Sequence, residues 1–208
     1  MSGHSNQILA AIVICANAPI DGFSVEAVVW KADMDPANSF ILTGTIQDVK
    51  QRLIRVNPSW TLSDNDKQTK KTMETDKTAD FPGLSCNALP SARTSAVEQA
   101  VHDLEHAHQV QLAFPTNRGN YCVTVSCVDD ARVWWCSSSP ITLHLPDSWK
   151  FFALKTRVVM ESCAAGDASF VSGQYSPPGA HFTVVVRGER CDSVPERLSW
   201  RIPSMATC

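Results

Sequence analysis

The sequence has no strong excess of charge of either sign, and this bounds its partners. Its 18 Lys and Arg stand against 21 Asp and Glu, which gives a formal net charge of −3. Domains that bind nucleic acid usually carry a clustered basic patch or a pI above about 9, whereas the pI here is about 6.0. Nucleic acid is therefore not an expected partner.

The sequence also lacks the short motifs that carry common chemistries. It has no G-x-S-x-G nucleophile elbow, no glycine-rich phosphate loop and no paired C-x2-C metal knuckles. Its longest apolar runs fall short of the roughly 20 residues that a membrane-spanning helix needs. We therefore expect no catalytic residue, no cofactor-binding residue, no metal ligand and no membrane span.

The N-terminus has the form of a secretion signal. The apolar run Ile8–Ala16 leads into Ala16-Asn17-Ala18, whose small-x-small pattern suits a signal peptidase. We predict a signal peptide over residues 1–18 and a secreted, extracellular protein from which Cys15 is removed. The alternative is an intracellular domain with a buried N-terminal strand, which the lack of Lys or Arg before the run and Pro19 after it would favour.

Residues 19–60 are predicted to form a small N-terminal β-β-α region. Stretches rich in β-branched and aromatic residues predict strands over Phe23–Trp30 and Ser39–Thr43. Thr45 and Asp48 are spaced as a capping box for a helix that a following Asn-Pro pair ends. The apolar stripe of this helix consists of Ile46, Val49, Leu53 and Val56.

Residues 61–80 contain hardly any apolar residue and are predicted to be a linker. They contain Lys70-Lys71, the only adjacent basic pair in the chain. In a secreted protein such a pair is a candidate processing site, and a cut there would make the N-terminal region a pro-region. The alternative interpretation is a solvated charge pair.

Residues 81–208 are predicted to form a cysteine-rich domain with two helices. The first begins at Thr94 or Ser95 and runs to about His108, and the second begins at Asp147 or Ser148. Each carries an apolar stripe at helical spacing, and the opposite face of the first helix is charged. The stripes are Val97, Val101 and Leu104, and Trp149, Phe152, Val159 and Cys163.

Four strands are expected beside these helices. Period-2 alternation predicts a β-hairpin of residues 121–127 and 132–136 around a turn at 128–131, with further strands over 169–174 and 181–187. The order of helices and strands predicts an α+β fold, an antiparallel sheet with helices packed on it as an α/β sandwich. The small β-β-α region precedes it, and disulfides stabilise it.

Eight cysteines in an extracellular chain predict a disulfide framework. With Cys15 removed, Cys208 at the end of the chain is the expected odd thiol. The sequence alone leaves the connectivity open. The disulfide candidates are Cys86, Cys122, Cys127, Cys136, Cys163 and Cys191.

One motif and one set of carboxylates offer an enzymatic alternative. His102, Glu105 and His106 match the H-x-x-E-H pattern of inverted zinc peptidases, in which two histidines one helical turn apart hold zinc beside a glutamate base. The simpler interpretation is a solvated helix face, to which Asp103 also belongs. Carboxylates suited to glycoside hydrolysis by convergence in space are Asp129, Asp130, Glu161 and Asp167.

Trp134 and Trp135 are neighbours in a predicted strand, so their side chains point to opposite faces of the sheet. One indole can then belong to the core while the other is exposed as a surface for a sugar or a partner protein. The alternative is that both are covered.

A series of short motifs runs through the chain after the signal. They are GTIQDV at 44–49, NPSW at 57–60, CVTVSC at 122–127, WWC at 134–136, VSGQ at 171–174 and VVVR at 184–187, followed by Cys191. Their order and cysteine spacing resemble those of small secreted cysteine-rich proteins of filamentous fungi, a group of effector candidates. The resemblance implies secretion, a disulfide-bonded α+β fold and a leader that ends in a dibasic pair, and it implies no established activity.

Together these observations predict a secreted cysteine-rich binding protein without enzymatic activity, a fungal effector of virulence type or an antimicrobial protein. The expected partner is a host or competitor protein or a glycan, and the expected state is a monomer. The alternative is a small secreted hydrolase that uses the carboxylates or the metal-assisted set of His102, Glu105 and His106.

Overall fold

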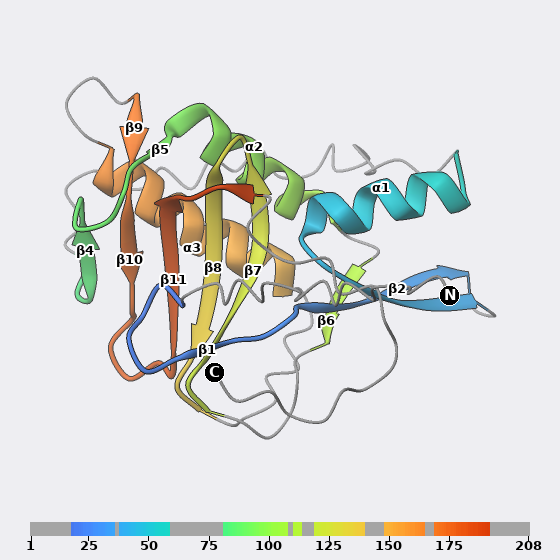
Figure 1. Cartoon of the computed structure of the whole chain (residues 1–208), viewed down its shortest axis with the longest axis horizontal. Helices are drawn as coiled ribbons and strands as arrows, with labels where there is room; N and C mark the ends of the chain where they lie inside the picture. Colours follow the sequence, from blue (N-terminus) through green and yellow to red (C-terminus); the bar gives the residue numbers. More distant parts are fainter. Residues whose placement is uncertain are drawn as a thin grey trace, which may run out of the picture.

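The computed structural model describes residues 18–35, 38–58, 81–107, 110–113, 119–139, 148–164 and 169–191 (Figure 1). The predicted signal peptide up to residue 17, Lys70-Lys71, Asp167 and Cys208 lie outside these residues. Below, residues 18–58 are called the N-terminal segment, and the described part of 81–191 is called the cysteine-rich half.

The fold is α+β, as predicted, with a six-stranded mixed sheet at its centre. Only the edge strand β1 is parallel to its neighbour, and the other pairs are antiparallel. The strand order is β1 (Ser24–Val25), β7 (Tyr121–Val128), β8 (Ala131–Ser137), β11 (Phe182–Gly188), β10 (Gly173–Tyr175) and β4 (Leu84–Cys86).

Two smaller sheets and three helices complete the fold. The three-stranded sheet has the order β3 (Asn38–Thr43), β2 (Val29–Asp35) and β6 (Val110–Ala113). The two-stranded sheet pairs β5 (Ala92–Arg93) with β9 (Phe170–Val171). The helices are α1 (Ile46–Val56), α2 (Thr94–Glu105) and α3 (Ser148–Cys163).

The predicted hairpin forms the middle of the large sheet as β7 and β8. Its two-residue turn places Asp129 and Asp130 at φ 44° and 60°. Both central residues of a type I′ turn need positive φ, and Asp is one of the residues that tolerate it. The turn fixes a register in which Val128 faces Ala131 and Cys122 faces Cys136.

Helices α2 and α3 cover one face of this sheet (Figure 1). Alternate residues of β7, β8 and β11 point to this face and pack against the helix stripes. Both stripes are buried as predicted, including Cys163 at 2% exposure. The core on this face includes Val97, Val101, Leu104, Val123, Val133, Trp135, Phe152, Val159 and Val184.

The opposite face of the sheet is covered as well, by the start of the N-terminal segment. Cys122, Trp134, Cys136 and Val185 form a buried cluster there. Residues packed against that cluster are Ala18, Ile20, Phe23, Val25 and Leu89. The sheet is therefore enclosed on both sides at its centre.

The N-terminal segment contains the predicted β-β-α elements, with two corrections. The strand expected over Phe23–Trp30 is divided into β1, which joins the large sheet, and β2, which joins the small one. The capping box is confirmed, since the Thr45 N–H donates to Asp48 Oδ2 at 2.8 Å. Val56 was expected in the buried stripe but is 60% exposed, because it lies in the last turn of α1 beyond the packed residues.

Candidate functional site

The three disulfides fasten different parts of the cysteine-rich half. Cys122 and Cys136 join directly opposed positions of β7 and β8. Cys86–Cys163 joins the edge strand β4 to the end of α3. Cys127–Cys191 joins the end of β7 to the chain after β11. As predicted, each hairpin cysteine pairs with another of the six.

Gly173, in the VSGQ motif, is required by one of these bonds. A Cβ at this position would lie 2.8 Å from Cys163 Sγ and 2.8 Å from the Ser85 carbonyl oxygen. Only a residue without a side chain lets β10 pair with β4 this close to the disulfide. The glycine therefore has a packing role.

Trp134 and Trp135 are both 0% exposed, so the interpretation in which both rings are covered is confirmed and neither indole is available as a binding surface. Trp135 packs on Phe152 of α3, with ring centroids 5.5 Å apart. Trp134 lies on the other face, under residues of the N-terminal segment. Because both faces of the sheet are covered, opposite orientation in the strand does not expose either ring.

A charged cluster that the sequence did not reveal lies beside Trp134. Glu189 Oε2 accepts from Trp134 Nε1 at 3.2 Å and lies 3.5 Å from Arg187 Nε. Its other oxygen is 3.7 Å from Nη1 of Arg132, a fully buried residue. Arg132 also donates to the Arg190 carbonyl. Buried charges need such partners, and these contacts fix the chain just before Cys191.

His102 and Glu105 lie on α2 as predicted and His106 is the residue that caps its end, but their groups are engaged within the protein. The rings of His102 and His106 are stacked with centroids 4.1 Å apart. His106 Nδ1 donates to the His102 carbonyl at 2.7 Å. Glu105 pairs with Arg157 of α3. Within the described ranges, no group of three or more His, Cys, Asp or Glu is placed to hold a metal ion.

Asp103, in the middle of that motif, was assigned to the solvated face but is 4% exposed. Its carboxylate accepts from Gln47 Nε2 at 2.9 Å, Gln99 Nε2 at 3.1 Å and Lys50 Nζ at 3.4 Å. Gln47 and Lys50 belong to α1, which docks over this side of α2. The face of α2 that carries Asp103 is not fully solvated, because α1 covers part of it.

The candidate carboxylates have separate surroundings. Asp129 and Asp130 form the hairpin turn, and Asp130 Oδ1 accepts from the Cys191 N–H at 3.2 Å. Glu161 is exposed on α3. The observed role of Asp130 is therefore structural, in the turn and at the neighbouring disulfide.

The surroundings of Tyr121 make its hydroxyl less acidic than usual. Burial raises its pKa above the usual value of 10.0, and the negative charge of Glu26 raises it further. A hydrogen bond with the Ser137 side chain opposes both effects. Tyr121 lies next to Cys122 at the start of β7, where β1 pairs with it.

An open hollow of about 450 Å³ lies where α2 begins, beside β5 and β9. Arg93 and Phe170 face each other across these two strands, so their side chains lie on the same side of the ribbon. Phe170 is 50% exposed. The Oγ1 of Thr94 is buried and has no hydrogen-bond partner among the described residues. The lining residues are Arg93, Thr94, Ser95, Glu98, Ser169 and Phe170.

This hollow combines an aromatic ring, a cation, a carboxylate and the hydroxyls of Ser95 and Ser169. Such a set can stack against an apolar face and hydrogen-bond a polar edge, as sugar and peptide ligands require. Sequence patterns do not indicate this hollow, because strands β5 and β9 are only two residues long and far apart in the chain.

No helix within the described ranges is both long and apolar enough to cross a membrane. Comparison of the chain with protein-family models, with curated proteins and with solved structures found no match.

Proposed function

We propose that the chain is a secreted, disulfide-stabilised protein that acts by binding rather than by catalysis, as a fungal effector or an antimicrobial protein. The observation that carries this proposal is the pairing of all six cysteines between Cys86 and Cys191. Disulfides form and persist in oxidising, extracellular surroundings. They also suit a protein that must survive proteases.

The resemblance to small secreted cysteine-rich fungal proteins supports the same proposal. Its CVTVSC and WWC motifs contain the two opposed cysteines of the hairpin, Cys122 and Cys136. Its VSGQ motif contains the glycine that lets β10 pass the Cys86–Cys163 bond. The motifs thus correspond to structural requirements of this fold, and the expected working state is a monomer.

The first test concerns secretion and oxidation. Protein collected from the culture medium of an expressing fungus is treated with an alkylating reagent before and after reduction, and its intact mass is measured. We expect the intact mass of a chain that begins after Ala18. We also expect the six cysteines from Cys86 to Cys191 to react only after reduction. Retention in the cell with reactive thiols would contradict the proposal.

The second test concerns the partner, which we propose contacts the hollow at the start of α2. Soluble chitin and β-glucan oligosaccharides are titrated calorimetrically against the protein and its Phe170→Ala variant. Loss of an aromatic stacking surface typically weakens binding by about tenfold or more. The control is Val56→Ala, which removes an exposed apolar side chain of α1. Equal weakening by both variants would argue against this surface.

The third test separates binding from hydrolysis. The same oligosaccharides and a peptide panel are incubated with the protein, with and without a chelator, and with Glu105→Gln. We expect no turnover in any sample. Hydrolysis that chelator and Glu105→Gln both abolish would establish the enzymatic alternative instead.

A further inference from the structure

The N-terminal segment belongs to the same core as the cysteine-rich half, yet no described disulfide reaches it. All three described disulfides join residues between Cys86 and Cys191. The segment is linked to the rest through the polar stretch 59–80 and through non-covalent contacts. These contacts are of three kinds.

The first kind is backbone pairing. β1 lies parallel to β7, with Ser24 opposite Tyr121, and the Ser24 N–H donates to the Asn120 carbonyl at 2.9 Å. The Glu26 N–H donates to the Cys122 carbonyl at 2.9 Å. β2 pairs with β6 from Val29 opposite Ala113 onward. The segment therefore provides one strand to the large sheet and two of the three strands of the small sheet.

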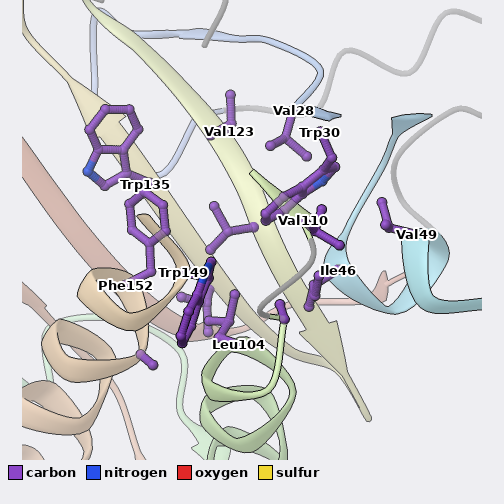
Figure 2. Packing of buried hydrophobic residues seen from close by; sticks show 14 of the residues in the cluster. Val28, Trp30, Ile46, Val49, Leu104, Val110, Val123, Trp135, Trp149 and Phe152 are labelled. Carbon is purple, nitrogen blue, oxygen red and sulfur yellow. The ribbon is translucent and has the colours of Figure 1, made fainter. Parts of the chain in front are cut away.

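The second kind is apolar packing. Trp30 is 0% exposed and Leu53 is 1% exposed. They belong to one buried cluster with Leu104, Val110 and Val123 of the cysteine-rich half. Figure 2 shows Trp30 beside Val110 within that cluster. If the segment were removed, this apolar surface would face water, which is strongly unfavourable.

The third kind is a polar network centred on Gln47 of α1. Its Nε2 donates to Asp103 Oδ2 at 2.9 Å, and its Oε1 accepts from the Cys127 N–H at 3.1 Å. Ser126 Oγ also bonds the same amide group, 2.9 Å from Nε2. One side chain thus bridges α2 and β7. Such a network specifies how α1 docks, since a shifted helix would leave buried Asp103 with fewer donors.

We propose that the surface formed by β6, β7 and the adjoining face of α2 is a binding site for the N-terminal segment as a separate chain. Hydrolysis of one peptide bond in 59–80, which adds water to give a carboxylate and an amine, would then leave a two-chain, non-covalent protein. The segment is a resident subunit rather than a pro-region that departs. This inference goes beyond the proposed function and does not depend on what the protein binds.

The experiment cuts the folded full-length protein. A recognition sequence for a site-specific protease is inserted between Lys70 and Lys71, and the purified, oxidised protein is cleaved to completion. We expect both pieces to co-elute in size-exclusion chromatography at the volume of the uncut protein. On a denaturing gel without reductant we expect two bands. The proposal would be overturned if the N-terminal piece eluted separately, at a later volume. A single band on the gel, from two covalently linked pieces, would overturn it as well.

Two neighbouring residues of α1 give a matched pair of variants. Leu53 is buried in the shared core, whereas Ile54 is 40% exposed. After cleavage, Leu53→Ala should raise the dissociation constant between the pieces by at least about tenfold, and Ile54→Ala should leave it within about twofold. Equal dissociation constants for the two variants would overturn the proposed surface.

Folding of each variant is checked by circular dichroism before cleavage. Should uncut Leu53→Ala fail to fold, Gln47→Ala replaces it, because that variant removes the polar bridge and leaves the apolar contacts. Its cleaved pieces should also separate at a higher concentration than those of the unmodified protein, because their dissociation constant is larger. A dissociation constant equal to that of the unmodified protein would then contradict the proposal.

Discussion

The N-terminal segment and the cysteine-rich half share one core but are stabilised by different means. The cysteine-rich half has three disulfides, which fasten its hairpin, an edge strand and the end of its last strand. The segment is held by strand pairing, by buried Trp30 and Leu53 and by the Gln47 network. Reducing conditions should therefore act directly on one region, while single side-chain deletions should act most on the other.

The largest effect is expected from Trp30→Ala in the N-terminal segment. The side chain is fully buried, and its Nε1 donates to the Gly44 carbonyl at 2.7 Å. Truncation leaves a large cavity and an unsatisfied carbonyl, and such changes lower the free energy of unfolding by about 3–5 kcal/mol. Denaturant unfolding followed by circular dichroism measures it.

The control for Trp30→Ala is Ile41→Ala on the neighbouring strand β3, where the side chain is 66% exposed. This variant should change the free energy of unfolding by less than about 0.5 kcal/mol. If both variants lowered the free energy of unfolding by the same amount, buried packing would not be what stabilises the N-terminal segment.

The next effect is expected in the cysteine-rich half. Replacing Cys127 and Cys191 together by Ala opens a bond that spans 64 positions, and removal of such a disulfide costs about 2–4 kcal/mol. Amide hydrogen exchange should show the loss of protection concentrated in β11 and the end of β7, with β2 and α1 less affected. Uniform loss across the chain would mean that the two regions do not differ in how they are held.

A smaller effect is expected where the two regions meet. Gln47→Ala leaves buried Asp103 and the Cys127 N–H without their amide partner, and a lost buried hydrogen-bonding partner costs about 1–3 kcal/mol. Gln51→Ala is the matched control, because Gln51 is an exposed glutamine one turn further along α1. If the network carried no stability, the two variants would have the same midpoint of thermal unfolding.

The smallest effect is a dependence on alkaline pH that arises at the same junction. The pKa of Tyr121 is raised by burial and by Glu26 of the N-terminal segment. A group whose folded pKa exceeds its unfolded value contributes stability that is fully present below the unfolded pKa, about 10. That contribution is lost as pH rises through the folded pKa.

The free energy of unfolding should therefore fall above pH of about 10, and Tyr121→Phe should flatten that fall. In Glu26→Gln, the absorbance titration of Tyr121 should shift to lower pH, because one of the charges that raises its pKa is gone. An unchanged titration would show that Glu26 does not act on Tyr121.

Much of the fold could be predicted because its local signals agree with its packing. The capping box at Thr45 and Asp48, the stripes of α2 and α3 and the two-residue turn at Asp129-Asp130 depend on neighbours a few residues apart. Periodicity reports which side of each element faces the core. These signals yielded the α+β class and the cysteines that pair.

Contacts between distant residues could not be predicted in the same way. Nothing local indicates that β1 joins β7 or that residues 18–25 cover the face on which Trp134 lies, so the sequence left open whether one indole is exposed. Asp103 was expected on a solvated face. It is buried because Gln47 and Lys50 approach it from another helix, and such contacts leave no local signal in the sequence. The hollow at Arg93 and Phe170 escaped notice for the same reason.

The parallel pairing of β1 with β7 also has a consequence for biosynthesis. The Ser24 side chain and the Asn120 carbonyl that it contacts are 96 positions apart, so the residues synthesised first must wait for partners synthesised much later. Contacts of such long range form slowly, and meanwhile Trp30 and Leu53 remain available to chaperones and to other nascent chains. The yield of folded protein therefore depends on how soon the hairpin forms and the N-terminal segment pairs with it.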